Sequence, residues 1–247
     1  MISDIKAYHA DGKDSQHLPD IVTRVKRRLW RSGLAMDTCV ADTGYSSGEN
    51  YAFLEDQNIK SYIPPHGTYK GGPEGFVYNE KEDCYTCSQG KTIPFKKVFY
   101  EKKNNTKKKE YRGSKKLCMY CPVRSACLGK SAQEKKFTVT YYRAEYQRNI
   151  ARVNSKKGSY MKGKRQSTVE PVFGTLTQFL GMGKVNTLGI KQANKCMHLS
   201  ATAYNLKKYL KYIKALPESI AGAVCFVFYR NSDRINVRII GFKPLTF

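Results

Sequence analysis

Apolar positions in the first 65 residues recur at two different periods, which predict helices and strands in alternation. Residues 38–41 and 61–63 are short β-prone runs, and residues 1–10 alternate more weakly. A second helix is expected between the two runs, capped by Ser46 or Ser47. Before the first run, five apolar residues have the spacing of a single helix face: Leu18, Ile21, Val22, Val25 and Leu29. This helix has Asp14 or Ser15 as candidate N-cap, Pro19 in its first turn and Gly33 at its end. The order strand, helix, strand, helix, strand predicts an α/β layer.

The pattern changes after residue 66. Glycine and proline interrupt any periodicity from residue 67, and residues 102–116 hold eight basic side chains. We therefore expect residues 1–66 to form the first part of one domain and residues 67–136 to be a Cys-rich insertion. Residues 137–214 would be the helical remainder of that domain, with helices near 141–153, 167–180 and 190–213. Residues 215–247 would be a β-prone tail of unassigned packing.

The charge of the chain indicates a polyanionic partner. A chain of 247 residues with 40% hydrophobic residues can bury a core, yet its formal net charge is +24. Nucleic acid is the commonest polyanion, and acidic membrane lipid is the alternative. The longest apolar run, residues 220–229, is about half of the roughly 20 residues that a spanning helix needs. No secretory signal is evident, so we expect a cytoplasmic protein with reduced thiols.

Five of the eight cysteines fall within residues 84–127, which is a zinc-binding pattern. Two CxxC pairs can supply the four thiolates of a tetrahedral Zn²⁺ site, and a metal would stabilise loops that look too polar to fold by hydrophobic burial. One candidate set is Cys84, Cys87, Cys118 and Cys121. We favour the other, because three of its members lie in the compact stretch CMYCPVRSAC: Cys87, Cys118, Cys121 and Cys127. We expect Cys39, Cys196 and Cys225 to lie in the core.

Two acids stand out by position. Asp42 ends the run 38–41, and the carboxyl ends of parallel strands are where open α/β sheets place their sites. Glu170 is the only acid between Glu145 and Glu218, at the start of an apolar helical stretch, and it follows three basic residues: Lys162, Lys164 and Arg165. Metal-dependent phosphodiester cleavage needs two or three such acids. The alternatives are that Asp42 caps the turn before the next helix and that Glu170 is a first-turn acid before Pro171.

The chain resembles the bacterial insertion-sequence transposases of the DDE type. The resemblance runs from about Met1 to Tyr212 and rests on five stretches in this order: ADTGYSSGENYAFLE, YIPP, the cysteine module, RQSTVEPVFGTL and QANKCMHLSATAYNLKKYL. It implies an α/β fold, with a ribonuclease-H-like mixed sheet and flanking helices. A small zinc-ribbon-like insertion would interrupt this domain between the second and third catalytic acids, and the C-terminal part would be helical.

The resemblance also implies which residues act. Asp42 would be the second catalytic acid and Glu170 the third, binding Mg²⁺ or Mn²⁺ for cleavage and transfer of DNA strands at element ends. Arg165 matches a basic position of the family that meets phosphate. We expect DNA contacts from Lys162, Lys164, Arg165 and Lys184, and a homo-oligomer, acting at the nucleoid, when the protein is active.

Two positions depart from the family pattern. No residue of the chain matches the first catalytic Asp, because Asp4, Asp11 and Asp14 fall on later positions. Thr177 stands where many relatives have a lysine seven residues after the Glu. We therefore expect an N-terminally truncated chain that binds DNA with little transposition activity of its own. The competing interpretations are a catalytically dead, zinc-containing DNA-binding remnant and a basic RNA-binding protein.

Overall fold

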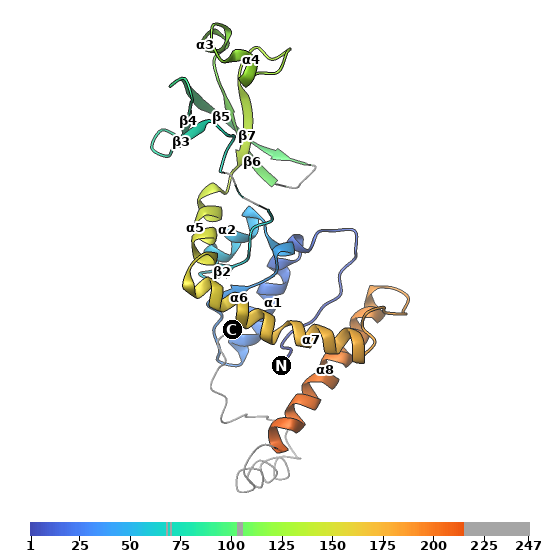
Figure 1. The fold of residues 1–247 in the computed structure, drawn as a ribbon. Helices are drawn as coiled ribbons and strands as arrows, with labels where there is room; N and C mark the ends of the chain where they lie inside the picture. Colours follow the sequence, from blue (N-terminus) through green and yellow to red (C-terminus); the bar gives the residue numbers. More distant parts are fainter. Residues whose placement is uncertain (68, 70, 103–105, 215–247) are drawn as a thin grey trace. The chain divides into compact units, whose positions relative to one another are not determined.

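The computed structural model describes residues 1–67, 69, 71–102 and 106–214 (Figure 1). It divides into two compact units. One is Cys39–Ser159, and the other combines Met1–Thr38 with Tyr160–Phe247. The expected tail at 215–247, with Cys225, lies outside the described residues.

Helix α1 (Leu18–Arg31) of the discontinuous unit confirms the periodicity of its apolar face, where Leu18 and Val22 are buried. Its N-cap is His17, whose side chain makes no capping hydrogen bond. The expected caps Asp14 and Ser15 lie instead in the preceding 3₁₀ turn η1 (Asp14–Gln16). The expected end at Gly33 is confirmed. Gly33 has φ +70° and donates its N–H to the carbonyl of Trp30 at 3.0 Å.

The weak strand expected at residues 1–10 is wrong, because this segment bonds to side chains of helix α8 (Ile190–Lys214) and lies in no described strand. Asn205 Oδ1 accepts from the N–H of Ile2 at 2.7 Å, and Asn194 Oδ1 accepts from that of Ala7 at 2.8 Å. The two asparagines are eleven residues apart, about 16 Å along a helix. The five residue steps from Ile2 to Ala7 span about the same length when extended, so the spacing of the two asparagine side chains along the helix matches that of the two backbone amides they bond.

The helical C-terminal part is confirmed, although the helix expected near residue 167 begins earlier. Helix α6 (Lys156–Thr168) is followed by α7 (Glu170–Gly174) and by a π-helical turn, η3 (Thr175–Phe179). Glycines lower helix propensity, and α6 has two of them. Gly158 is required here, because a Cβ would collide with the backbone carbonyls of Arg152 and Val153.

The strands and helix expected between residues 38 and 63 are confirmed in the other unit. Strands β1 (Thr38–Val40) and β2 (Lys60–Tyr62) pair in a two-stranded sheet. Between them, Ser47 caps helix α2 (Gly48–Asp56) by accepting from the N–H of Asn50 at 3.1 Å. Helix α5 (Arg143–Val153) packs against α2 and β2 (Figure 1). The apolar side chains between these elements are almost fully buried: Tyr51, Leu54, Ile59 and Ile63.

A five-stranded antiparallel sheet occupies much of the segment that was expected to be loop-rich. Its strand order follows the chain: β3 (Phe76–Asn79), β4 (Cys84–Cys87), β5 (Thr92–Glu101), β6 (Thr106–Arg112) and β7 (Lys136–Thr140). The expectation that this segment is too polar to fold by hydrophobic burial is wrong. Tyr85, Ile93 and Tyr111 form a buried cluster, with Phe76, Tyr78, Phe137 and Val139 packed around it.

The short helices α3 (Lys115–Met119) and α4 (Arg124–Cys127) lie at the end of this sheet remote from α5 (Figure 1). The chain is thus a mixed α/β protein with a curled antiparallel sheet and helices, consistent with a ribonuclease-H-like DDE domain.

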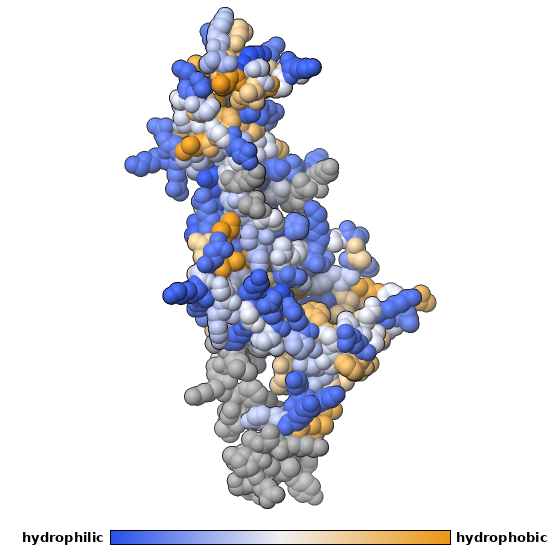
Figure 2. Space-filling model, viewed as in Figure 1, coloured by the Kyte–Doolittle hydropathy of each residue, from blue (hydrophilic) through white to orange (hydrophobic). Residues whose placement is uncertain are grey.

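Hydrophilic residues cover most of the face seen in Figure 2, with hydrophobic residues in smaller patches. Among the described residues, no helix is both long enough and apolar enough to cross a membrane.

Candidate active site

Asp42 lies in the turn that follows β1. Its carboxylate accepts a hydrogen bond from the N–H of Thr43 at 2.8 Å and so caps the 3₁₀ turn η2 (Thr43–Tyr45). The capping role that the sequence left open is therefore real. The residue is nevertheless exposed, so its carboxylate can be reached by solvent and by a ligand.

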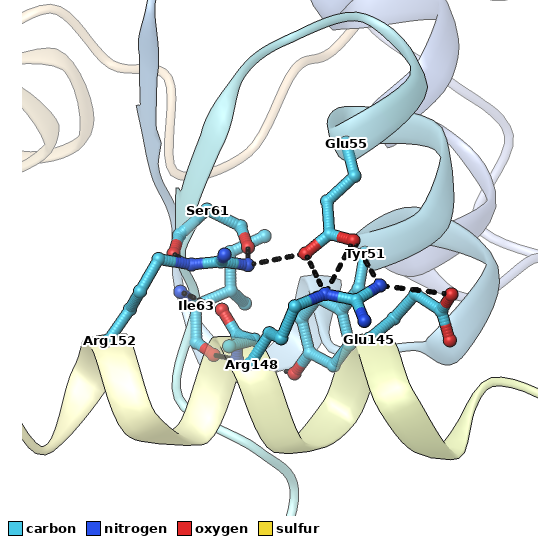
Figure 3. A network of polar contacts seen from close by, with 8 residues as sticks. Tyr51, Glu55, Ser61, Ile63, Glu145, Arg148 and Arg152 are labelled. Carbon is cyan, nitrogen blue, oxygen red and sulfur yellow. Dashed lines mark hydrogen bonds and ion pairs between the residues drawn. The ribbon is translucent and has the colours of Figure 1, made fainter.

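A network of polar contacts fixes the strand beside β1 (Figure 3). Asn149 of α5 is fully buried and donates to the carbonyl of Ile63 at 2.8 Å. Arg152 donates to both the carbonyl and the hydroxyl of Ser61, at 3.2 and 3.0 Å. Since β2 pairs with β1, these contacts also hold the strand that leads to Asp42.

Glu55 joins this network from helix α2. It forms ion pairs with Arg152 at 2.9 Å and with Arg148 at 2.6 Å, and Arg148 also reaches Glu145 (Figure 3). Burial raises the pKa of the Glu55 carboxyl, but hydrogen bonds from the two arginines outweigh it, so the pKa is lowered overall. Sequence reasoning missed this network. Glu55 and Ile63 lie in stretches that carry the family resemblance, but their partners on α5 lie in none of them, and only the packing of α5 on α2 and β2 brings the members together.

Glu170 is the first residue of α7, with Pro171 behind it in the first turn. Its side chain is 56% exposed and lies 3.4 Å from a guanidinium nitrogen of Arg165, near the end of α6. Glu170 is thus an accessible acid next to a basic side chain. The basic neighbour and the position at the start of a helix were expected from the sequence.

The other basic residues expected to contact DNA lie in the same unit. Lys162 and Lys164 are on α6, and the ammonium of Lys164 lies 5.9 Å from the ring centroid of Tyr160. Lys184 is exposed in the segment between η3 and α8. Asp42 belongs to one compact unit and Glu170 to the other, so their joint role stays a prediction.

The first CxxC pair does not form a metal-binding turn. Cys84 and Cys87 are the two ends of strand β4, and residues three apart in a strand point to opposite faces. Cys84 is buried, and burial followed by a contact with Glu82 raises the pKa of its thiol. Both features disfavour Cys84 as a zinc ligand.

The second CxxC pair lies in a turn. Cys118 is near the end of α3, Cys121 follows that helix and Cys127 ends α4. Across the described part of the chain, however, no three or more His, Cys, Asp or Glu side chains are grouped so as to hold a metal ion. The structure therefore gives the expected zinc site no support, and the cysteines described are free thiols.

The sequence model of the transposase DDE domain family matches residues 86–210, half of the chain. The chain therefore belongs to this family. The matched residues include Glu170 and the basic residues of α6, whereas Asp42 precedes them. No curated protein and no solved structure matches the chain. Membership implies a transposase that acts on DNA and uses divalent metal ions.

Proposed function

We propose that this transposase chain cleaves and transfers DNA strands at the ends of a mobile element, with Asp42 and Glu170 as metal-binding acids. The observation that carries the proposal is the setting of Glu170. It is an exposed carboxylate within the family match, it pairs with Arg165, and it follows a helix that has several basic residues and no acid.

The two acids fit a hard divalent cation. Carboxylate oxygens are the ligands that Mg²⁺ and Mn²⁺ prefer, and Mg²⁺ keeps several of its waters, which suits exposed side chains. When bound, such ions activate the attacking water or hydroxyl and stabilise the leaving oxygen. In this proposal Arg165 contacts a phosphate beside Glu170. Lys162, Lys164 and Lys184 bind the DNA backbone, and the active protein is a homo-oligomer at the nucleoid.

A nicking assay tests the proposal. Purified chain is incubated with supercoiled plasmid carrying element ends, in Mg²⁺, Mn²⁺ or EDTA. Because no residue matches the first catalytic Asp, we expect only weak nicking, which requires metal and is lost in Asp42→Asn and in Glu170→Gln. Asp37→Asn is the matched control, since Asp37 is an exposed acid that directly precedes β1, whereas Asp42 follows it. Metal-dependent nicking that survives either test substitution would overturn the proposal.

A second candidate function is DNA binding without cleavage. It is favoured by the contacts of the acids themselves, because Asp42 caps Thr43 and Glu170 pairs with Arg165. A chain that binds element ends and leaves them intact in both metal ions would support this function over the first.

We also propose that Zn²⁺ binds Cys87, Cys118, Cys121 and Cys127. This proposal rests on the spacing of the cysteines in the sequence. In the structure, Cys118 lies at the end of the sheet. A Cβ at Gly113 would lie 3.5 Å from its Sγ and 2.9 Å from Cδ1 of Ile93. Ile93 pairs with Tyr85 on β4, and Cys87 shares the Tyr85 face of that strand. Zinc analysis of the purified chain and of Cys118→Ser tests this: one Zn²⁺ per chain, lost in the variant, is expected.

A further inference from the structure

Strand β6 carries a lysine between two exposed tyrosines. Tyr100 of β5 is directly opposite Lys107, and on the other side Tyr141, just past β7, donates its N–H to the Lys107 carbonyl at 3.1 Å. The three side chains therefore form one row across three neighbouring chain segments, which we call the Tyr–Lys–Tyr row. Tyr100 is 50% exposed and Tyr141 44%. The Lys107 ammonium lies 6.0 Å from the Tyr141 ring centroid, within cation–π range.

A second row lies beside the first on the same face. Lys109 is flanked by Val98 and Val139, and its ammonium lies 5.8 Å from the ring of Tyr141 and 5.5 Å from that of Phe95. It also pairs with Asp83 at 2.7 Å, so part of its charge is compensated. The two lysines are about 6.6 Å apart along the strand, a separation comparable with that of successive phosphates in a DNA strand.

The row is anchored to the start of helix α2. Glu49 in the first turn of α2 accepts hydrogen bonds from the Thr106 hydroxyl and, at 3.3 Å, from the N–H of Lys107. Tyr142 packs closely on the same turn: a Cβ added at Gly48 would lie 2.7 Å from the Cβ of Tyr142. Glu49 is only seven residues after Asp42, so this end of the sheet is tied to the helix that follows the candidate acid.

The charge of this part of the sheet suits a polyanion. Residues 92–112, which include β5 and β6, hold eight basic and two acidic side chains. Both acids are already paired, Glu101 with Lys108 and Glu110 with Lys136. The surface therefore has an excess of positive charge next to exposed aromatic rings. This combination binds single-stranded nucleic acid, because lysines contact phosphates and rings stack on bases.

We propose that the Tyr–Lys–Tyr row binds a DNA strand whose bases are unpaired, such as the strand exposed when an element end is opened. Lys107 contacts a phosphate of this strand, and Tyr100 and Tyr141 stack on its bases. The choice of DNA rests on the proposed function. The bases of an intact duplex are stacked on one another, so the two rings contribute to binding of the opened strand and not of the duplex.

Fluorescence anisotropy with the full chain in EDTA tests this inference. The probes are a labelled single-stranded DNA, the same sequence as a duplex, and the same sequence as RNA. We expect Tyr100→Leu and Tyr141→Leu each to weaken single-strand binding at least about fivefold and to leave duplex binding unchanged. Lys107→Gln should reduce the slope of log K against log salt by about 0.7 on the single strand.

Two matched controls lie elsewhere in the same compact unit. Lys97→Gln removes the same charge from the opposite face of the sheet, since Lys97 is opposite Glu110 in the strand register and Glu110 faces away from Lys107. Tyr120→Leu removes a ring that is 86% exposed. Equal losses for Lys97→Gln and Lys107→Gln, or equal losses on single strand and duplex, would overturn the inference. So would RNA binding that is tighter than DNA binding and depends on the same two rings.

A measurement on the wild-type chain tests the inference without relying on the folding of the substituted chains. Photo-crosslinking of wild-type chain to a strand containing 5-bromodeoxyuridine should give peptides that contain Tyr100 or Tyr141, and crosslinks confined to other peptides would contradict the inference. Because these assays need no metal, Asp42→Asn should bind the strand normally. Loss of single-strand binding in the row variants together with metal-dependent nicking by Asp42→Asn would therefore refute the proposed acid and leave the row intact.

Discussion

Arg165 and Glu170 form an ion pair of 3.4 Å across the junction between α6 and α7. The pair is partly exposed, with Glu170 at 56%, so it contributes at most about 1 kcal/mol to stability. Its more important consequence is positional, because it keeps a guanidinium next to the acid that the family match includes. The guanidinium of Arg165 is therefore positioned to donate bidentate hydrogen bonds to the oxygens of a phosphate that binds beside Glu170.

Arg165→Gln should separate DNA binding from stability. We expect the free energy of unfolding to change by less than about 1 kcal/mol, and the salt slope of duplex DNA binding to fall by about 0.9, as for one lost phosphate contact. Urea unfolding and anisotropy over a salt series measure the two quantities. Arg31→Gln, an exposed arginine at the end of α1, is the control. A slope unchanged in Arg165→Gln would show that this arginine does not contact phosphate.

Asn149→Leu should destabilise the unit that carries Asp42. The substitution removes the side-chain partner of the Ile63 N–H in a fully buried position, and it leaves the Ile63 carbonyl with only the Tyr51 hydroxyl at 3.4 Å. Such a loss costs about 1–3 kcal/mol, measurable by urea unfolding. Gln147→Leu changes an exposed amide on the same helix and should cost less than about 0.5 kcal/mol. Similar costs at both positions would argue against the buried contact.

The ion pairs of Glu55 predict a dependence of stability on pH. Hydrogen bonds from Arg148 and Arg152 outweigh burial and lower the folded-state pKa of Glu55 below its ordinary value of 4.5. The stabilisation is therefore fully present above pH 4.5 and is lost as pH falls through the folded-state pKa. Wild type and Glu55→Gln should differ in unfolding free energy at pH 7 and converge at lower pH. A difference that stays constant down to pH 2 would contradict this assignment.

Thiol reactivity should follow burial. Burial raises the pKa of the Cys39 thiol to about 12, and the pKa of Cys84 is also raised. At pH 8 we therefore expect iodoacetamide to modify Cys118, Cys121 and Cys127 well before Cys39 and Cys84. Peptide mass spectrometry over time measures the order. If zinc binds as proposed, added Zn²⁺ slows the modification of Cys87, Cys118, Cys121 and Cys127 together.

Local signals in the sequence predicted the helices well. Ser47 and Gly33 act where expected because capping and positive φ are properties of single residues in their immediate context. Asp42 and Glu170 are predicted from motifs, and each lies at an exposed start of an element; their catalytic role stays a prediction. The strand expected at residues 1–10 does not form, because side chains 203 and 187 residues further along the chain bond its backbone.

The antiparallel sheet could not be read from periodicity. Its core draws Tyr85, Ile93, Tyr111 and Phe137 from four different strands, and the intervening lysines hide their alternation. The contact of Asn149 with Ile63 joins residues 86 apart and was equally invisible. These features depend on long-range packing, which a single sequence does not encode in any local pattern.

Iron-directed cleavage of the chain tests most directly whether Asp42 and Glu170 hold the same metal. Fe²⁺ takes the place of Mg²⁺, and with ascorbate and peroxide it cuts the backbone close to where it is bound. If the two acids share a metal, we expect fragments that end near residue 42 and near residue 170. These fragments should disappear together in Asp42→Asn or Glu170→Gln and persist in Asp37→Asn. Fragments at one place alone, or fragments near residue 170 that persist in Asp42→Asn, would contradict a shared metal site.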